Sequence, residues 1–233
     1  MRTFISFEEA RNIVMVSAPR LADEHVPLQE ALGRTLAKTI VANEDSQPFD
    51  NSALDGYAVL RKDCKQVPTA LSVIGEIPAG APFDGTLIPG TCARIMTGAP
   101  IPNGADAVVP VEKTTEDRET VSIQECPGEH AHIRWAGEDF SSGDIMLAAG
   151  ITITPPVVGM LATLGAVPVP VALRPKVSVI STGDEIVSPD AIPGRGQIRN
   201  SNGPALAAQV VSAGGDARSI LHAPDDPARL RQT

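Results

Sequence analysis

The segment 47–59, QPFDNSALDGYAV, gathers several oxygen-bearing side chains in one turn-rich stretch. Asp50 and Asp55 lie five residues apart, with Asn51 and Ser52 between them, and a glycine follows the second aspartate. Such oxygens can bind a hard cation or position a polar substrate. Because Asp and Asn also bond their own backbone in turns, the segment alone fits a strand entry as well as a binding site.

A second polar group follows the apolar run KVSVI, whose composition is typical of a parallel strand. Ligands of open α/β sheets bind outside the carboxyl ends of the strands, which is where this group falls. Hard oxygen donors suit Mg²⁺ better than zinc or copper. We therefore expect a binding site formed by Ser181, Thr182, Gly183, Asp184 and Glu185.

Two further segments belong to the same expected crevice. Asp225, in APDDP, follows the next expected parallel strand, whereas Asp226 before Pro227 is typical of a helix cap. The segment IRNSNG, 198–203, opens the intervening helix, and Asn202 lies where N-terminal amides could hold an anion.

Two loops outside this crevice also carry candidate groups. Thr97, in RIMTGAPIPNGADAVV, offers a hydroxyl on a proline-rich loop that fits an ordinary hairpin equally well. Asp139, in RWAGEDFSSGD, follows Gly137 and Glu138, and by itself the segment is typical of a solvated turn.

Composition limits the classes of function. The 233 residues are 42% hydrophobic, with 20 glycines and 21 prolines, which indicates a folded, turn-rich chain with β structure. A net charge of −9 without a basic run argues against nucleic acid and anionic membranes as partners. The sequence has neither a P-loop nor a Gly-x-Ser-x-Gly elbow. Without an apolar signal core or a membrane-length run, we expect a cytoplasmic protein.

The three cysteines do not form a recognisable framework. They are widely spaced, odd in number and lack a Cys-x-x-Cys pair, so structural zinc and disulfides are not expected. We expect buried free thiols at Cys64, Cys92 and Cys126.

Periodicity indicates the elements that carry these groups. Ser6 and Glu9 form a capping box for a helix over 6–21, and a short helix is expected at 28–32. Thr154 and the prolines after it favour a helix within 151–166. Short β-prone runs between 43 and 134, separated by Pro/Gly-rich turns, indicate a small barrel or sandwich. They are Leu71–Ile74, Cys92–Ile95, Ala107–Val111 and Thr120–Ile123.

The last segment, from 176 onward, has the pattern of a β-α-β unit. The helix within it is expected to begin at a cap provided by Ser201 or Asn202. Two strands and one helix cannot bury a doubly wound sheet, so we expect the sequence to stop inside a domain of this class.

Taken in order, several motifs resemble the molybdopterin molybdenumtransferase (MoeA) family, whose eukaryotic relative is the gephyrin E domain. They are PFDNSALDGYAV, GEIPAGAPFDGTLIPGTCARIMTGAPIPNGADAVVPVE, RWAGED, STGDE and IRNSN. The resemblance runs from near residue 6 to the last residue. It implies transfer of molybdenum from molybdate into adenylylated molybdopterin with release of AMP, assisted by Mg²⁺. It also implies a homodimer and a molybdopterin adenylyltransferase as upstream partner.

The resemblance further implies a multi-domain, mixed α/β fold. Residues 1–42 and 135–168 would form a discontinuous helical/β first domain that mediates dimerisation, and residues 43–134 an inserted β-rich, barrel-like domain. Residues 169–233 would begin a doubly wound α/β domain of the molybdopterin-binding kind. The family's later Ser-Gly-Gly loop would lie beyond Thr233, so we expect the chain to lack much of the pterin pocket.

Site residues carry over where the motifs match. Leu54 replaces the methionine usual in the family's DNSAMDGYA motif. In the family the inserted domain of one subunit faces the third domain of the other, so the turn at 50–55 would form one wall of a shared site. The implied catalytic residues are Asp55, Thr97, Asp139, Glu185 and Asp225, of which Glu185 and Asp225 are the implied metal ligands.

Two other functions remain open from the sequence. A non-catalytic dimeric binding or assembly module of the same family would keep the motifs without turnover. A magnesium-dependent phosphohydrolase of other descent would explain the carboxylates but not the order of the motifs. The reading frame beyond Thr233 separates the first two hypotheses, because a following Ser-Gly-Gly loop favours the enzyme.

Overall fold

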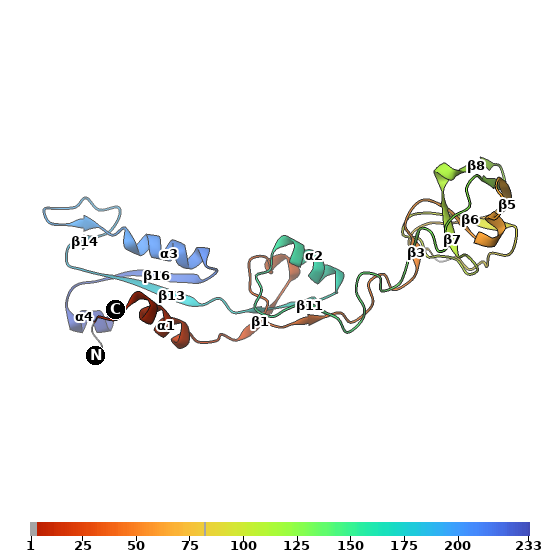
Figure 1. Cartoon of the computed structure of the whole chain (residues 1–233). Coiled ribbons are helices and arrows are strands. Elements are labelled where there is room, and N and C mark those ends of the chain that lie inside the picture. The colour runs from red at the N-terminus through yellow and green to blue at the C-terminus, as the bar shows by residue number, and fades with distance from the viewer. Residues whose placement is uncertain (1–3, 82) are drawn as a thin grey trace. The chain divides into compact units, whose positions relative to one another are not determined.

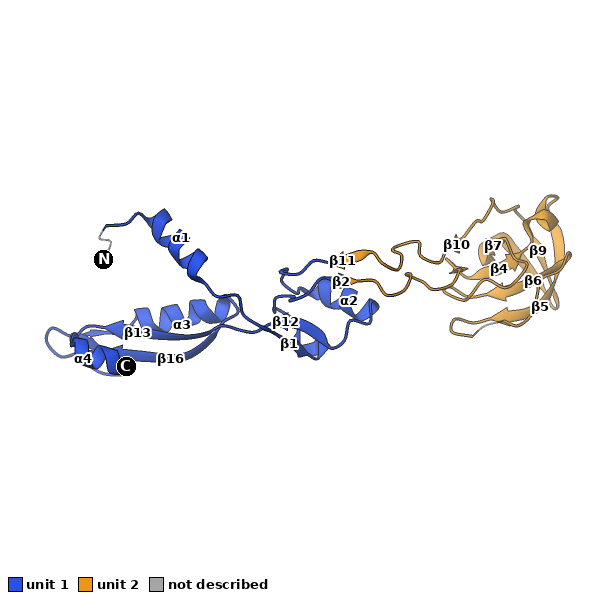
Figure 2. Ribbon diagram, turned by 90° about the horizontal axis from the view of Figure 1, so that it is seen from below, with its two compact units in different colours: residues 1–40, 147–233 blue, residues 41–146 orange. Residues whose placement is uncertain are grey.

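The computed structural model describes residues 4–81 and 83–233, and it divides into two compact units (Figure 2). Unit 1 comprises residues 1–40 and 147–233, and unit 2 comprises residues 41–146. The chain passes between them at β2 (Ile40–Val41) and β11 (Ile145–Leu147). The three-domain boundaries expected from the sequence stay predictions, and their first three residues lie outside the described part.

Unit 2 is built on one six-stranded sheet with the order β7-β4-β6-β5-β9-β8. Neighbouring strands are antiparallel except β5 and β6, which are parallel. The expected β-prone runs fall within β5, β6, β9 and, apart from its last residue, β7. The strands are β4 (Gly56–Val59), β5 (Thr69–Ile77), β6 (Thr91–Ile95), β7 (Ala107–Pro110), β8 (Thr114–Asp117) and β9 (Thr120–Ile123).

Both faces of this sheet are covered by apolar side chains. Tyr57 and Val59 pack in one core cluster, whereas Ala58 between them packs in another. All four residues of β4 are buried, as expected for a strand whose alternating side chains enter two cores. The sequence of β4 is accordingly a short apolar run and not an alternating one.

The sheet curls so that β8 approaches strands that are not its neighbours. The Tyr57 hydroxyl of β4 donates a hydrogen bond to Glu116 of β8, although three strands separate them in the sheet order. Arg94 of β6 also pairs with Glu116, with 3.0 Å between Nη1 and Oε1. These contacts show that the sheet curls, in agreement with the β-rich, barrel-like fold expected for this part of the chain.

Short elements complete unit 2 around the sheet. Two 3₁₀ turns follow β4 and β7, and a two-residue antiparallel pair brings β3 beside β10. Their bounds are β3 (Asn51–Ser52), η2 (Arg61–Cys64), η3 (Val111–Lys113) and β10 (Ile133–Arg134).

One part of unit 1 packs a short helix against antiparallel strands. Its core contains Leu36, Ile153, Leu161 and Val171, all fully buried. Thr154 lies at the N-cap of α2, but its side chain makes no capping hydrogen bond, and prolines occupy the first turn instead. The elements are β1 (Asp23–Val26), η1 (Leu28–Glu30), α2 (Pro155–Thr163) and β12 (Val169–Ala172).

Helix α1 (Phe7–Ser17) precedes these elements and has no buried residue. Ser6 caps it as expected, since its hydroxyl accepts the N–H of Glu9 at 3.1 Å. The helix ends at Ser17, four residues earlier than its pattern indicates, because Ala18 and the residues after it leave helical geometry.

The other part of unit 1 is the expected β-α-β unit. β13 (Lys176–Thr182) and β16 (Asp216–Ala223) are parallel, and α3 (Asn202–Ser212) packs against both (Figure 1). β14 (Ile186–Val187) pairs in parallel with β15 (Ile198–Arg199), and α4 (Pro227–Gln232) closes the segment. The mixed α/β class expected from the sequence is confirmed.

The thiols agree with an expectation from composition. Cys64, Cys92 and Cys126 are free, the first two fully buried and the third half-buried. Burial raises the pKa of Cys64 to about 11 and that of Cys92 to about 12, so both stay protonated at neutral pH. Within the part of the chain that the structure describes, no helix has the length and apolar character needed to cross a bilayer.

Candidate functional site

Asp55 and Thr97 meet at one end of the unit 2 sheet. Asp55 immediately precedes β4, and Thr97 follows β6, its antiparallel neighbour. Asp55 Oδ1 accepts the backbone N–H and the hydroxyl of Thr97, each at 2.7 Å. The hydrogen bonds from Thr97 lower the pKa of Asp55, and the nearby charge of Arg94 lowers it further. Asp55 is therefore an exposed, ionised carboxylate held by one of its oxygens.

Gly56 lets β4 start directly after Asp55. A Cβ at this position would stand 2.1 Å from the carbonyl oxygen of Val109 on β7, far inside contact distance. Only glycine permits that approach. The Asp-Gly pair therefore couples the carboxylate to a tightly packed strand.

A network of three side chains surrounds this end of the sheet. Tyr57 and Arg94 are direct partners in the β4–β6 register, so their side chains share one face. Both bind Glu116 Oε1. Burial, together with the bond to Glu116, raises the pKa of Tyr57 well above its ordinary value, so the hydroxyl remains a donor.

Asp139 belongs to a different loop of unit 2. Its N–H donates to Ser46 Oγ at 3.0 Å, and Gln47 Nε2 donates to its carboxylate at 3.3 Å. Asp50 holds the same loop, because its Oδ1 accepts the N–H of Ala136 at 2.9 Å. The segment expected to be a solvated turn is thus fixed to residues 46–50.

The unit 1 candidates lie at the carboxyl ends of two parallel strands. Register pairs Thr182 with Ala223, so STGDE and APDDP leave the sheet side by side. The Ser181 hydroxyl donates to Asn200 Oδ1 at 3.1 Å. The same oxygen accepts the N–H of Gly203 at 2.9 Å, which ties the start of α3 to the strand end.

Gly183 and the acids after it form the turn beyond β13. Gly183 has φ +136, a backbone conformation that favours glycine, and a Cβ there would stand 2.5 Å from Oε2 at the end of the flexible Glu185 side chain. Its carbonyl lies 2.8 Å from His222 Nε2. Asp184 Oδ1 accepts the N–H of Asp225 at 3.2 Å, which joins the two strand ends.

Asp226 caps α4 because its side chain accepts the N–H groups of Ala228 and Arg229, as its position before proline predicts.

The structure therefore holds two separate groups of predicted residues. Asp55 and Thr97 are bonded to each other in unit 2, and Asp139 lies in another loop of that unit. The strand-end group in unit 1 consists of Ser181, Thr182, Gly183, Asp184, Glu185, Asn202 and Asp225. Asn202 is the first residue of α3, and Asn200, two residues earlier, makes the contacts to Ser181 and Gly203.

The donor chemistry at the strand ends fits Mg²⁺. Glu185 and Asp225 are exposed carboxylates, and magnesium in proteins is commonly held by one or two carboxylates together with substrate phosphates and water. Over residues 4–81 and 83–233, no three His, Cys, Asp or Glu groups form a metal cluster.

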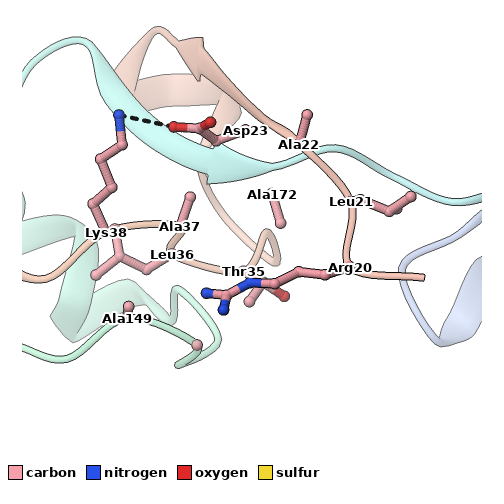
Figure 3. Close-up of a pocket in the computed structure, with 11 residues that line it drawn as sticks. Arg20, Leu21, Ala22, Asp23, Thr35, Leu36, Ala37, Lys38, Ala149 and Ala172 are labelled. Carbon is pink, nitrogen blue, oxygen red and sulfur yellow. Dashed lines mark ion pairs between the residues drawn. The ribbon is translucent and has the colours of Figure 1, made fainter. Parts of the chain in front are cut away.

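A pocket of about 350 Å³ in unit 1 is not lined by any of the predicted site residues (Figure 3). Lys38 and Asp23 pair on its wall, with 2.9 Å between Nζ and Oδ2, and the guanidinium of Arg20 lies at its other side. This pocket is therefore separate from the strand-end acids.

Arg94, Glu116 and Asn200 were absent from the site residues expected from sequence. The alternation of side chains along a strand could have placed Arg94 on the same face as Tyr57. Arg94 lies two residues after Cys92, which packs in the same core cluster as Tyr57. Asn200 stands inside the IRNSN motif.

Two family models match this chain. Residues 5–165 match the family described as MoeA N-terminal region (domain I and II), and residues 178–233 match the probable molybdopterin binding domain. A molybdopterin molybdenumtransferase 2 from Mycobacterium tuberculosis is 44% identical over 209 residues, covering 88% of this chain and 52% of that protein. A molybdopterin molybdenumtransferase from Staphylococcus epidermidis is 38% identical over 211 residues, covering 89% of this chain and 50% of that protein.

Solved structures show the same likeness over nearly all of the chain. Two crystal structures of the molybdopterin biosynthesis MoeA protein from Pyrococcus horikoshii are 32% identical and cover 99% of this chain, with TM-scores of 0.86 and 0.91. This chain covers 60% and 62% of those two chains, and it spans about half the length of the curated relatives it matches. The chain therefore belongs to the MoeA family, of which it carries the N-terminal region and residues of the molybdopterin-binding domain.

Proposed function

We propose that this protein acts in molybdenum cofactor biosynthesis as a molybdopterin molybdenumtransferase. The reaction would insert molybdenum from molybdate into adenylylated molybdopterin and release AMP, with Mg²⁺ as cofactor. Curated relatives that carry the transferase name support the class of reaction.

The observation that carries the proposal is the doubly bonded carboxylate of Asp55. Thr97 directs two donors to Oδ1, and no described residue donates to Oδ2. An ionised carboxylate fixed in this way is a hydrogen-bond acceptor of defined direction, suited to an N–H or O–H group of a pterin or ribose. A general acid would need a raised pKa, which is the opposite of the shift here.

The second half of the proposed site is the strand-end group of unit 1. Glu185 and Asp225 would hold Mg²⁺ on the substrate phosphates, and Asn200 would keep the start of α3 against Ser181. The bound cation would offset the charge of the phosphoanhydride. The protein side chains would orient the anhydride so that attack of water at phosphorus breaks the P–O–P link, with AMP as the leaving group.

The family resemblance supports further parts of the proposal. We propose a homodimer in which unit 2 of one subunit completes the strand-end site of the other. The upstream partner would be a molybdopterin adenylyltransferase, which makes the adenylylated substrate, and the compartment would be the cytoplasm.

Release of AMP by the purified protein tests this function. Adenylylated molybdopterin, molybdate and Mg²⁺ are supplied, and Asp55→Asn, Glu185→Gln and Asp225→Asn are compared with wild type. Each should lower turnover at least about ten-fold, the scale expected when a positioned polar group is lost from an active site. Asp117→Asn, an exposed acid of β8, is the matched control and should keep the wild-type rate. Wild-type rates in all three site variants would contradict the proposal.

A further inference from the structure

The proposed substrates present a charge problem to this protein. Phosphate and molybdate are anions, whereas the residues implied for the site are mostly carboxylates and the chain carries a net charge of −9. Carboxylates cannot bind an oxyanion directly, and a cationic side chain can bind one in addition to a metal ion or helix N-terminal amides. In unit 2 that side chain should lie beside Asp55 and Thr97.

Arg94 occupies this position on β6. It stands three residues before Thr97 and opposite Tyr57 of β4, and Glu76 of β5 faces it in the other register. It is also the cation whose charge acts on Asp55, after the stronger effect of the Thr97 hydrogen bonds. The β4–β6 register thus pairs Arg94 with Tyr57, which lies two residues after the fixed carboxylate of Asp55.

The Arg94 guanidinium contacts Glu116 and still has N–H donors that could bind a ligand. Its Nη1 contacts Glu116 Oε1 at 3.0 Å, and the same oxygen also accepts the Tyr57 hydroxyl. A guanidinium has five N–H donors, and among the described residues Nε and Nη2 of Arg94 have no partner. The side chain is 41% exposed, so these donors are open to a ligand.

We propose that Arg94 binds a tetrahedral oxyanion, a phosphate or molybdate, beside Asp55 and Thr97, and that Glu116 positions its guanidinium for this contact. The inference rests on the proposed function and adds to it a residue that binds the substrate's negative charge. Phosphate and molybdate share the geometry that the planar fork of arginine recognises through two parallel N–H groups. A lysine at the same place would supply charge without that fork.

Calorimetric binding to the full chain, in buffer containing Mg²⁺, tests the inference with AMP, adenosine and molybdate as separate probes. We expect AMP or molybdate to bind and adenosine to bind much more weakly.

Arg94→Gln should weaken oxyanion binding at least about ten-fold, as expected for loss of a charge-assisted hydrogen-bond pair. Arg94→Lys should fall between wild type and Arg94→Gln, and Glu116→Gln should cause a smaller loss. The exposed Lys62→Gln is the matched control for net charge and should leave binding unchanged.

The probes show whether Arg94 binds phosphate or molybdate, and they separate failure of this inference from failure of the proposed function. A loss confined to AMP identifies the phosphate, and a loss confined to molybdate identifies the metal oxyanion; either supports the inference. Equal binding by wild type and Arg94→Gln, or undetectable binding of both oxyanions, overturns it. If Arg94→Gln binds normally while Asp55→Asn loses turnover, the proposed function stands and only the inference fails. Thermal melts of each variant show whether a loss arises from unfolding.

Discussion

Asp55 Oδ1 accepts both the N–H and the hydroxyl of Thr97, each at 2.7 Å. This pair joins the residue before β4 to the turn after β6, which are adjacent antiparallel strands. Because both bonds favour the ionised form, they hold the pKa of Asp55 below its ordinary value. The carboxylate therefore stays charged over the whole range of pH in which the protein would work.

Removal of the Thr97 hydroxyl tests this electrostatic link. Thr97→Val keeps the backbone bond and loses the side-chain bond, so the pKa of Asp55 should rise toward its ordinary value. A carboxyl whose pKa is lowered by folding stabilises the fold above its ordinary pKa, and that contribution is lost as pH falls through the folded-state value. Thr97→Val should therefore lose less stability on acidification than wild type. NMR titration of the Asp55 carboxyl carbon and acid unfolding measure both effects.

Thr115→Val is the control for that experiment, since Thr115 is an exposed threonine of β8. It should leave the titration of Asp55 unchanged. An unaltered pKa in Thr97→Val would show that the hydroxyl bond contributes nothing to the charge of Asp55.

Local signals predicted most of the elements. The Ser6 cap, the prolines at the start of α2 and the Asp226 cap of α4 act within three or four residues, so they can be read from sequence. The apolar runs of β5, β6 and β9 were likewise evident as short strands between turns. Helix α1 was expected to extend to residue 21, but it ends at Ser17, after which the backbone becomes extended.

The details of the site depended on contacts that no local pattern contains. Glu116 contacts Tyr57 and Arg94 only because the sheet curls. The register of β8 determines which acidic residue of that strand makes these contacts. Asn200, and not a capping side chain of Ser201, accepts the N–H at the start of α3. The motif resemblance indicated the segments that contain each candidate site, whereas the fold determines which atoms of those segments are in contact.

The turn after β13 should tolerate only glycine at position 183. In Gly183→Ala the new methyl would meet the Glu185 carboxylate at 2.5 Å, in a backbone conformation that side chains rarely adopt. We expect a loss of about 1–3 kcal/mol in the free energy of unfolding. Gly159→Ala is the matched control, because a Cβ within α2 meets nothing within 4 Å. It should stabilise the protein by about 0.5–1 kcal/mol. Urea unfolding compares them, and equal stability of the two variants would contradict the prediction.

Arg34 should be the most important cation for the stability of unit 1. Its side chain is only 9% exposed, and Nη2 contacts Glu24 Oε1 at 2.6 Å and the carbonyl of Ala172 at 2.8 Å. Arg34→Met would leave both acceptors without this donor, so we expect a loss of about 2–3 kcal/mol by urea unfolding. Lys38→Met breaks an exposed pair with Asp23 and should have little effect. Comparable losses in both variants would show that burial does not set the strength of the Arg34 contacts.

Helix α1 should depend on association with a second copy of the chain. It has eleven residues, none of them buried, and isolated helices of this length are marginal in water. Phe7, Ile13 and Val14 lie on one face of the helix and are 78%, 46% and 66% exposed, so pairing across a two-fold axis would cover this apolar face. In light scattering at tens of micromolar the full chain should therefore be a dimer, and Ile13→Asp and Val14→Asp should shift it toward monomer. Asn12→Asp introduces the same charge on the opposite face of the helix and should remain dimeric. A wild-type monomer would remove the support for a site shared between subunits, whereas a dimer unaffected by the aspartates would place the interface on other elements.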